Sequence, residues 1–402
     1  MIKTMNEQQI LKAVESKKND IIDFLRRIIA IPSTSAKEKE VVAEIKKEME
    51  KLGYDKVWAD KAGNIIGQIG TGKTKIVFDS HIDTVDIGDI KSWKHDPFKG
   101  KFENDTVYGR GASDNKGATA CQVYGAAIMK ELGLVDDFTV YVVGTVQEED
   151  CDGAAMMHLL TKTLPDVNYV VMGECTDLCV YRGHRGRMEI TVTAKGKSCH
   201  GSAPDRGINA IYKMAPIISA IEKLNDHLKR DDFLGKGTIA VTKIECQTPS
   251  LNSVPDECKI YIDRRLTVGE TKESSVKEIE DIAKGNAKVE VLYYDTPSYT
   301  GEHIDQEKYF PTWVLPEDHK LVQAGAKTYE KLFGKKTAIS KWVFSTNGVA
   351  SMGTLGIPTI GFGPSKEEYA HSIDDKVTAE HLLKSTAFYT AFANVLINDY
   401  TD

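Results

Sequence analysis

The sequence predicts an α/β protein in which a mixed, mainly parallel sheet is flanked by helices and interrupted by an inserted α+β domain. Apolar, strand-like runs alternate with segments of helical periodicity, and the runs are apolar on both faces, as in parallel strands that helices cover. This pattern stops after Arg182 and resumes near Pro297. A chain of 402 residues also exceeds the usual size of one domain. We therefore expect one discontinuous domain, residues 1–182 plus 297–402, and one inserted domain, residues 183–296.

The elements of the first domain follow from the spacing of its apolar residues. Helical spacing runs over 7–30 and stops at Pro32, and a second helix carries an apolar face from Val41 to Leu52 before Gly53 ends it. Short apolar runs bounded by polar residues or glycine predict strands. The remaining predicted elements are strands 65–69, 75–79, 139–144, 169–173 and 357–362, and helices 117–132 and 321–332.

The inserted domain has a different pattern, because its strands alternate in polarity like strands with one solvent-facing side. The order of predicted elements is strand, helix, strand, strand, helix, strand, which is the split βαβ or ferredoxin-like arrangement of one sheet and two helices. The predicted ranges are 188–194, 208–224, 238–246, 257–266, 272–283 and 288–293. Gly183 and Gly186 precede the first strand and could act as a hinge.

Composition excludes several classes of protein. The net charge of −7 argues against a nucleic-acid partner or an anionic membrane surface. No apolar run approaches the roughly 18 residues of a membrane-spanning helix, and the first residues lack the apolar stretch of a signal peptide. The seven cysteines form no compact disulfide framework. We therefore expect a cytoplasmic location.

A His-x-Asp motif follows one predicted strand. His81 and Asp83 lie two residues apart after the apolar run 75–79. On an extended chain they point the same way, so that one imidazole nitrogen can bind a metal ion while the other donates to Asp83. The motif is short and becomes informative only together with others.

Two further motifs supply carboxylates. Asp114 lies in the glycine-rich segment 109–117, where it could bridge two cations or, alternatively, cap the following helix. Glu148 and Glu149 follow the predicted strand 139–144. Adjacent carboxylates at a strand end repel each other unless a cation is present, and their side chains diverge, so that one could bind metal while the other faces the attacking water. The alternative is a solvated acidic turn.

Glu174 and His371 also follow predicted strands. Ligands in α/β proteins collect at the carboxyl ends of strands, so we expect these side chains to gather with His81, Asp114 and Glu149 around two divalent metal ions. With only nitrogen and oxygen ligands, zinc is the first choice, and cobalt or manganese are alternatives. The pattern predicts a two-metal hydrolase.

These motifs resemble those of the zinc metallohydrolase family of aminoacylases, acetylornithine deacetylases, succinyl-diaminopimelate desuccinylases and glutamate carboxypeptidases. The resemblance covers nearly the whole chain, including the inserted domain. It rests on the segments 80–85 and 109–117 and on the Glu148-Glu149 pair. Segments 81–89 and 361–367 are most similar to a branch of the family named for a link to selenium metabolism.

The resemblance implies roles for the motif residues. His81 and Glu174 would hold one metal ion, Glu149 and His371 the other, and Asp114 both. Asp83 would orient His81, and Glu148 would be the general base and acid. Relatives often have a non-proline cis peptide at the position of Asp114-Asn115.

The resemblance also implies substrate-binding residues and a dimer. His200, in the inserted domain, would stabilise the reaction intermediate, in many relatives at the site of a partner chain, so a homodimer through this domain is expected. Arg265 would bind a substrate carboxylate, with Arg264 as the competing candidate, and Asn252 and Gly348 would support substrate binding. The chain departs from many relatives in having Cys175 in place of proline and Asn347 in place of aspartate.

The predicted activity is cleavage of an amide bond in a small carboxylate-bearing substrate, an N-acyl amino acid or a dipeptide, by metal-bound hydroxide with Glu148 as general base. Deacylase, dipeptidase and carboxypeptidase activities stay open. Hydrolysis of a ureido or carbamoyl C–N bond is an alternative on the same site. A non-catalytic metal-binding homologue is less favoured, because no ligand position is lost.

Overall fold

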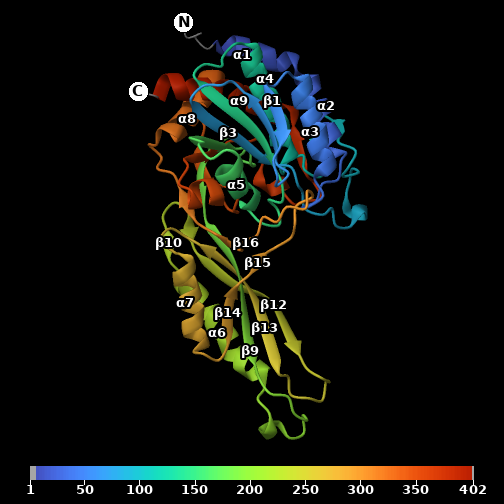
Figure 1. The fold of residues 1–402 in the computed structure, drawn as a ribbon, viewed down its shortest axis with the longest axis vertical. Helices are drawn as coiled ribbons and strands as arrows, with labels where there is room; N and C mark the ends of the chain where they lie inside the picture. The colour runs from blue at the N-terminus through green and yellow to red at the C-terminus, as the bar shows by residue number, and fades with distance from the viewer. Residues whose placement is uncertain (1–5, 401–402) are drawn as a thin grey trace.

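The computed structural model describes residues 6–400 and divides them between a larger part, built on a nine-stranded sheet, and a smaller part, built on a five-stranded sheet (Figure 1). The large sheet contains β1 (Lys56–Ala59), β2 (Ile65–Ile69), β3 (Thr74–His81), β6 (Phe138–Thr145), β7 (Tyr169–Met172), β8 (Val180–His184), β18 (Trp313–Val314), β19 (Ile339–Trp342) and β20 (Thr359–Gly361).

The centre of the large sheet is parallel. Its strand order is β1-β2-β6-β3-β7-β20-β8-β18, with β19 paired to β8. β3 lies parallel to β6 and β7, and β7 lies parallel to β20, whereas β1, β2 and β18 join antiparallel. This confirms the predicted mixed, mainly parallel sheet, and it brings the carboxyl ends of four neighbouring strands to one edge.

Helices cover both faces of this sheet. Side chains alternate between the two faces along each strand, and the central strands β3 and β6 bury apolar residues on both. Ile76 and Phe78 of β3 pack into the core beneath the larger helical layer, and Val77 packs on the opposite face against Met156 and Leu159. The larger layer contains α1 (Glu7–Ser16), α2 (Lys18–Ile29), α3 (Lys39–Lys51), α4 (Lys116–Glu131), α8 (Lys320–Phe333) and α9 (Ala379–Tyr400). The opposite face carries α5 (Ala154–His158) and the π-helical turn η2 (Leu159–Thr163).

Two predictions for the larger part were incomplete. The single helix expected over 7–30 is two helices, because the backbone leaves the helical conformation at Lys17, with φ −99° and ψ 4°. The sequence analysis also did not predict α9, which is buried along most of its length. Short strands complete this part and the connections around it: β4 (Lys101–Glu103), β5 (Thr106–Tyr108), β21 (Lys376–Thr378), β10 (Arg230–Asp231), β11 (Gly235–Lys236), β15 (Tyr293–Tyr294) and β16 (Gln306–Glu307).

The smaller part, which we call the lid, has the predicted split βαβ order. It contains β9 (Gly186–Lys195), α6 (Ala210–His227), β12 (Thr238–Gln247), β13 (Glu257–Leu266), α7 (Lys272–Ala283), β14 (Lys288–Val291) and β17 (Tyr309–Phe310). Its strand order is β12-β13-β9-β14, and β17 pairs with β9. Both helices pack on one face of this sheet around a separate apolar core that includes Ile190, Ile217 and Ile279.

The lid extends away from the large sheet (Figure 1). β8 of the large sheet leads almost directly into β9 of the lid, with Arg185 between them. β12 is one edge strand of the lid sheet, and its second half is exposed. The bounds 183–296 for an independent inserted domain stay a prediction. None of the helices within residues 6–400 is both long enough and apolar enough to cross a membrane.

Candidate active site

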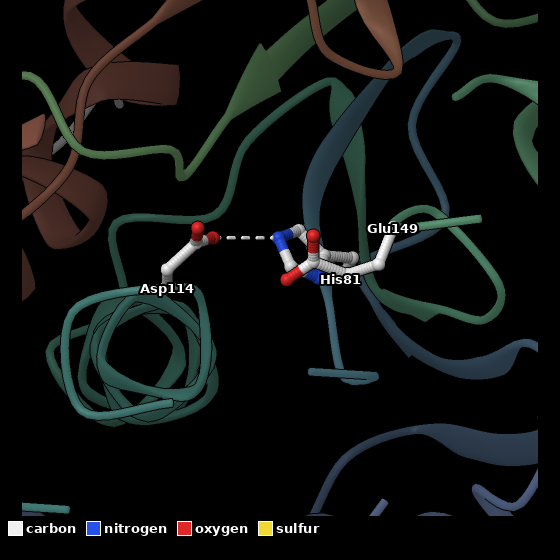
Figure 2. Close-up of side chains that lie close together, drawn as sticks. All are labelled: His81, Asp114 and Glu149. Carbon is white, nitrogen blue, oxygen red and sulfur yellow. Dashed lines mark hydrogen bonds and ion pairs between the residues drawn. The ribbon is translucent and has the colours of Figure 1, made fainter. Parts of the chain in front are cut away.

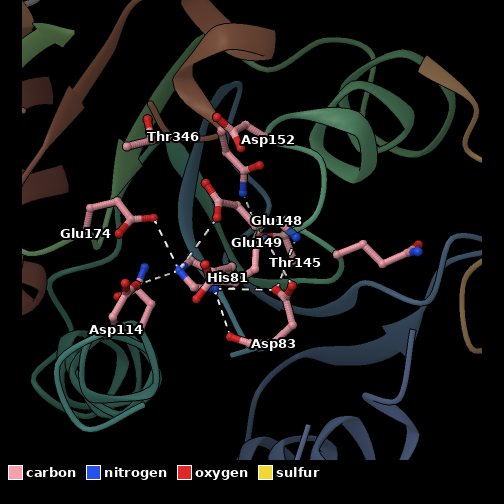
Figure 3. Close-up of polar contacts among 12 residues, drawn as sticks. His81, Asp83, Asp114, Thr145, Glu148, Glu149, Asp152, Glu174 and Thr346 are labelled. Carbon is pink, nitrogen blue, oxygen red and sulfur yellow. Dashed lines mark hydrogen bonds and ion pairs between the residues drawn. The ribbon is translucent and has the colours of Figure 1, made fainter. Parts of the chain in front are cut away.

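Polar side chains gather where the central parallel strands of the large sheet end. His81 is the last residue of β3, Glu148 follows β6, and Glu174 follows β7. His371 comes after β20 and the 3-10 turn η5 (Glu367–Tyr369). Asp114 approaches from the loop before α4. The structure thus brings together predicted residues from five separate segments of the chain. Figure 3 labels those of four segments, all except His371.

Asp114 lies between two histidines. Its Oδ1 is 2.9 Å from Nε2 of His81 (Figure 2), and its Oδ2 is 3.3 Å from Nε2 of His371. Glu149 Oε2 lies 2.9 Å from His371 Nε2, and Glu174 Oε1 lies 3.6 Å from His81 Nε2. One oxygen of Asp114 therefore faces His81, which lies near Glu174, and the other faces His371, which lies near Glu149.

The alternative role of Asp114 as a helix cap is wrong. The residue at the N-cap of α4 is Asn115, and it makes no side-chain capping hydrogen bond. The Asp114-Asn115 peptide bond is cis, as the resemblance implied.

Asp83 holds the turn that carries the two glutamates. Its carboxylate accepts hydrogen bonds from the backbone N–H groups of Glu148 at 3.2 Å and Glu149 at 3.1 Å, and from the Ser35 hydroxyl at 2.7 Å. The His81 Nδ1 lies 3.0 Å from the backbone carbonyl of Asp83 and 3.4 Å from its carboxylate. Asp83 therefore contacts His81 through both its backbone and its side chain, and it also fixes the Glu148-Glu149 turn (Figure 3).

The glycine-rich loop that carries Asp114 is held by Asp375. The buried Asp375 carboxylate accepts hydrogen bonds from the N–H groups of Gly111 at 2.8 Å and Ser113 at 2.7 Å. Arg110 donates to the same carboxylate at 3.2 Å. Since Asp375 lies four residues beyond His371, it connects the His371 loop to the Asp114 loop.

The protonation of the cluster is strongly perturbed. Burial raises the pKa of Glu148 well above its usual value; His81 lowers it in part, and neighbouring carboxylates, Glu174 among them, raise it further. Burial likewise raises the pKa of Glu174. The pKa of Asp114 is held low, because hydrogen bonds from His371 and His81 outweigh its burial. These shifts reflect several acidic groups crowded in a buried space.

The donors fit divalent cations. His81, Asp114 and Glu149 offer ligand atoms that all lie within 4.8 Å of one another. The Oε1 of Glu149 is buried and has no hydrogen-bond partner among residues 6–400. A buried carboxylate oxygen without a partner is costly unless a cation or a donor meets it. Imidazole and carboxylate together are typical ligands of zinc and similar metals.

The cluster opens into a cavity of about 410 Å³. Arg265 of β13 lines this cavity from the lid side, together with Arg187 of β9, which lies directly opposite it in the sheet register. The competing candidate Arg264 is fully buried elsewhere and pairs with Glu270 at 2.6 Å. The geometry therefore places Arg265, and not Arg264, at the cavity.

Three other predicted residues lie outside this cavity. His200 and Asn252 are exposed neighbours on the lid, where the N–H of Gly201 donates to the Asn252 carbonyl at 2.7 Å. Gly348 is buried, and a Cβ added to it would lie 2.5 Å from the Trp313 ring. The substrate-binding roles of these three residues stay predictions.

Sequence reasoning did not identify several residues that line the cavity. Asp152 accepts a hydrogen bond from Arg187 at 3.0 Å and another from Ser345. Glu367, from η5, lines the same space. Arg187 could have been found from its strand register with Arg265, but that register depends on the tertiary pairing of β9 with β13.

Comparison with known proteins agrees with the fold. The Uncharacterized protein YgeY of Escherichia coli (strain K12) is 48% identical to this chain over 394 residues, which cover 97% of the chain and 98% of the relative. Succinyl-diaminopimelate desuccinylase of Hydrogenovibrio crunogenus is 24% identical, with 94% and 99% covered. A dinuclear metal binding peptidase of Bacillus subtilis superposes with a TM-score of 0.71 at 16% identity, with 96% and 100% covered, and so shares the fold.

The sequence model of the peptidase family M20/M25/M40 matches residues 77–395. This match spans most of the large sheet and the whole lid, from β3 through α9. It includes every residue that the sequence analysis assigned to metal binding or catalysis. The chain therefore belongs to the peptidase family M20/M25/M40 and is a hydrolase that acts on C–N bonds.

Proposed function

We propose that this protein is a two-metal amidohydrolase that cleaves the amide bond of a small carboxylate-bearing substrate, an N-acyl amino acid or a dipeptide. The observation that carries the proposal is the position of Asp114, whose two oxygens lie 2.9 and 3.3 Å from the Nε2 atoms of two different histidines. A carboxylate in this position suits a bridge between two cations. The names of the relatives, a desuccinylase and a dinuclear peptidase, support the same class of reaction.

In this proposal, His81 and Glu174 hold one metal ion, Glu149 and His371 hold the second, and Asp114 bridges them. Zinc is the expected metal, with cobalt or manganese as alternatives. When bound, the two cations would lower the pKa of a coordinated water and polarise the substrate carbonyl.

Glu148 is the proposed proton carrier. Its Oε2 lies 4.0 Å from His81 Nε2, so the carboxylate is beside the ligand groups, and Asp83 fixes its backbone. Burial raises the pKa of Glu148, and a carboxylate with a raised pKa is a better proton acceptor than an ordinary one. Glu148 would take a proton from the attacking water and give it to the leaving nitrogen.

The lid would supply substrate binding. Arg265 lines the cavity, and a guanidinium pairs well with a carboxylate. His200 and Asn252 lie together on an exposed part of the lid outside the cavity. We therefore propose a homodimer in which the lid, residues 183–296, carries His200 to the site of a second chain. A cytoplasmic location and a link to selenium metabolism stay predictions from the sequence.

Hydrolysis assays on a panel of N-acyl amino acids, dipeptides and ureido acids test this proposal. With added zinc, cobalt or manganese, the wild-type protein should hydrolyse at least one amide of the panel. Glu148→Gln should lose on the order of 10²–10⁴-fold in kcat, because a general base contributes about that much, and should keep its metal. The neighbouring Asp150→Asn should keep its activity, because Asp150 is exposed in the same turn. Full activity of Glu148→Gln would contradict the proposed role of Glu148. If only the ureido acids were hydrolysed, the bond that this protein cleaves would be a ureido bond and not an amide.

A further inference from the structure

The segment between β20 and His371 carries a carboxylate with no role in the proposed reaction. This segment, Gly361-Phe362-Gly363-Pro364-Ser365-Lys366-Glu367, leads from the end of β20 into η5. Glu367 begins η5 and lines the cavity, four residues before His371. The side chain therefore faces the same space as the metal cluster without belonging to it.

The carboxylate of Glu367 has no cationic partner. Among residues 6–400, no lysine, arginine or histidine nitrogen lies within 4.0 Å of it, and its Oε1 is buried without a hydrogen-bond partner. The backbone N–H of Val343 is the donor that stabilises its charged form, yet burial raises the pKa of Glu367 to about 7. Burying a carboxylate in this way is costly unless a ligand brings a positive charge or a donor.

The other charged groups of the cavity wall are already paired. Asp152 accepts hydrogen bonds from Arg187 at 3.0 Å and from the Ser345 hydroxyl. Arg265 is held by both oxygens of Asp263, at 2.8 and 3.0 Å. Glu367 thus differs from Asp152, the other carboxylate of the wall outside the metal cluster, because no residue within 6–400 neutralises it. The cavity thus combines two lid arginines, each paired with a carboxylate, with an unpaired acidic group near His371.

We propose that Glu367 is a specificity-determining residue that binds a primary ammonium group of the substrate. The substrate would then be zwitterionic, with its ammonium group at Glu367 and its carboxylate at the lid arginines. The two charged groups would lie on opposite sides of the scissile amide, or both would lie on the leaving amino acid. This inference rests on the proposed function and narrows its substrate class. The amine belongs either to the acyl part, as in a dipeptide, or to the leaving part, as in an N-acyl diamino acid.

Two isosteric substrate pairs distinguish an amine on the acyl part from an amine on the leaving part. Glycyl-leucine and propionyl-leucine differ by an ammonium or a methyl group on the acyl side. Nα-acetyl-lysine and Nα-acetyl-2-aminoheptanoate differ in the same way on the leaving side. The metal-loaded wild-type protein should prefer the amine member of one pair by about 10–100-fold in kcat/KM, since a charged hydrogen bond contributes about that much. The pair that shows the preference identifies the position of the amine.

Glu367→Gln tests the residue directly. It should reduce the preference to within about threefold while kcat/KM for the methyl member stays unchanged, because the amide keeps the shape and removes the charge. Glu368→Gln, at the exposed neighbouring position, should keep the wild-type preference. Three results would overturn the inference and leave the proposed amidohydrolase activity intact. They are equal kcat/KM for both members of each pair in the wild type, an unchanged preference in Glu367→Gln, and an equal loss of kcat/KM for both members in Glu367→Gln. No turnover of these four substrates or of any member of the hydrolysis panel would overturn the proposed function and the inference with it.

Discussion

Asn347 donates a hydrogen bond to the buried Asp79, with 3.1 Å between its Nδ2 and the Oδ2 of the carboxylate. The same amide nitrogen donates to the Thr145 hydroxyl at 2.9 Å, and the amide oxygen accepts from the N–H of Gly153 at 2.9 Å. Asn347 therefore ties β3 and β6 to the turn that follows Glu149. An amide is required here because its partner is a carboxylate that cannot donate when ionised.

Replacing Asn347 by aspartate should destabilise the protein. The change places two carboxylates about one hydrogen-bond length apart in the interior, and an unpaired buried charge costs on the order of 3–5 kcal/mol. The exchanged pair Asp79→Asn with Asn347→Asp should recover part of this loss, because the donor and acceptor are then reversed. Urea unfolding of the two single variants and the double variant measures the interaction. Additive losses in the double variant would show that the hydrogen bond does not couple the two residues.

His184, at the junction of β8 and the lid, is held neutral by its contacts. Its Nδ1 lies 2.8 Å from the Arg185 carbonyl, and its Nε2 faces two donors, the indole N–H of Trp313 at 2.8 Å and the backbone N–H of Thr346 at 3.1 Å. If Nε2 carried a proton, its N–H would point at these two N–H groups and could not accept their hydrogen bonds. Burial, the largest cause, lowers the pKa of His184 from 6.5 to about 4.

The stability of the protein should therefore depend on pH through His184. Because the pKa is lower in the folded state, the unfolded chain binds the proton first as the pH falls from about 6.5 to about 4. Stability is complete above this window and is lost within it, by about 3 kcal/mol for this group. The difference in unfolding free energy between wild type and His184→Gln, measured from pH 8 to pH 4, should show this slope. The exposed His227→Gln is the control and should follow the wild-type curve; a wild-type curve parallel to that of His184→Gln would contradict the assignment.

Asp375 should support metal binding without being a ligand. Its removal frees the N–H groups of Gly111 and Ser113 and the guanidinium of Arg110, so the loop that carries Asp114 loses its anchor. Asp375→Ala should lower metal affinity by about 10–100-fold, the range for residues that orient metal ligands. Competition with a chelator measures the affinity. The adjacent Asp374→Ala, on an exposed side chain paired with Lys376, should bind metal like the wild type, and an equal effect of both changes would contradict a specific role of Asp375.

The proposed dimer predicts complementation between two inactive variants. Glu148→Ala and His200→Ala should each be inactive alone and retain metal. When the two are mixed and allowed to exchange subunits, one site of each mixed dimer has both residues, so activity should return to about one quarter of the wild-type value. If His200 acts within its own chain, mixing restores nothing. The light-scattering mass of the wild-type protein shows independently whether the chain is a dimer.

Much of the fold could be predicted from the sequence, because local pattern and tertiary environment agree. β2, β13 and α7 begin and end at the predicted residues. The break at Lys17 was missed because the apolar spacing from Val14 to Ile21 fits an uninterrupted helix. α9 was missed because it is buried on nearly all sides and so lacks a polar face.

The candidate site was predictable to the extent that its residues follow strands. The five proposed ligands, Asp83 and Glu148 lie in short motifs, and the parallel sheet brings those motifs to one edge. The positions of Arg187 and Glu367 depend instead on how the lid and the η5 turn approach the sheet. The role of Asn347 was also hidden, because its partner Asp79 lies 268 residues away in the sequence.

The most direct test of the two-metal site is the metal content of the purified protein, measured by elemental analysis after equilibration with zinc and removal of unbound metal. The proposed bridge predicts about two ions per chain in the wild type and in Glu148→Ala, and less than about one in Asp114→Ala, since both ions share that carboxylate. A folded wild-type protein that binds no metal, or an Asp114→Ala variant that keeps two ions, would contradict the proposed site.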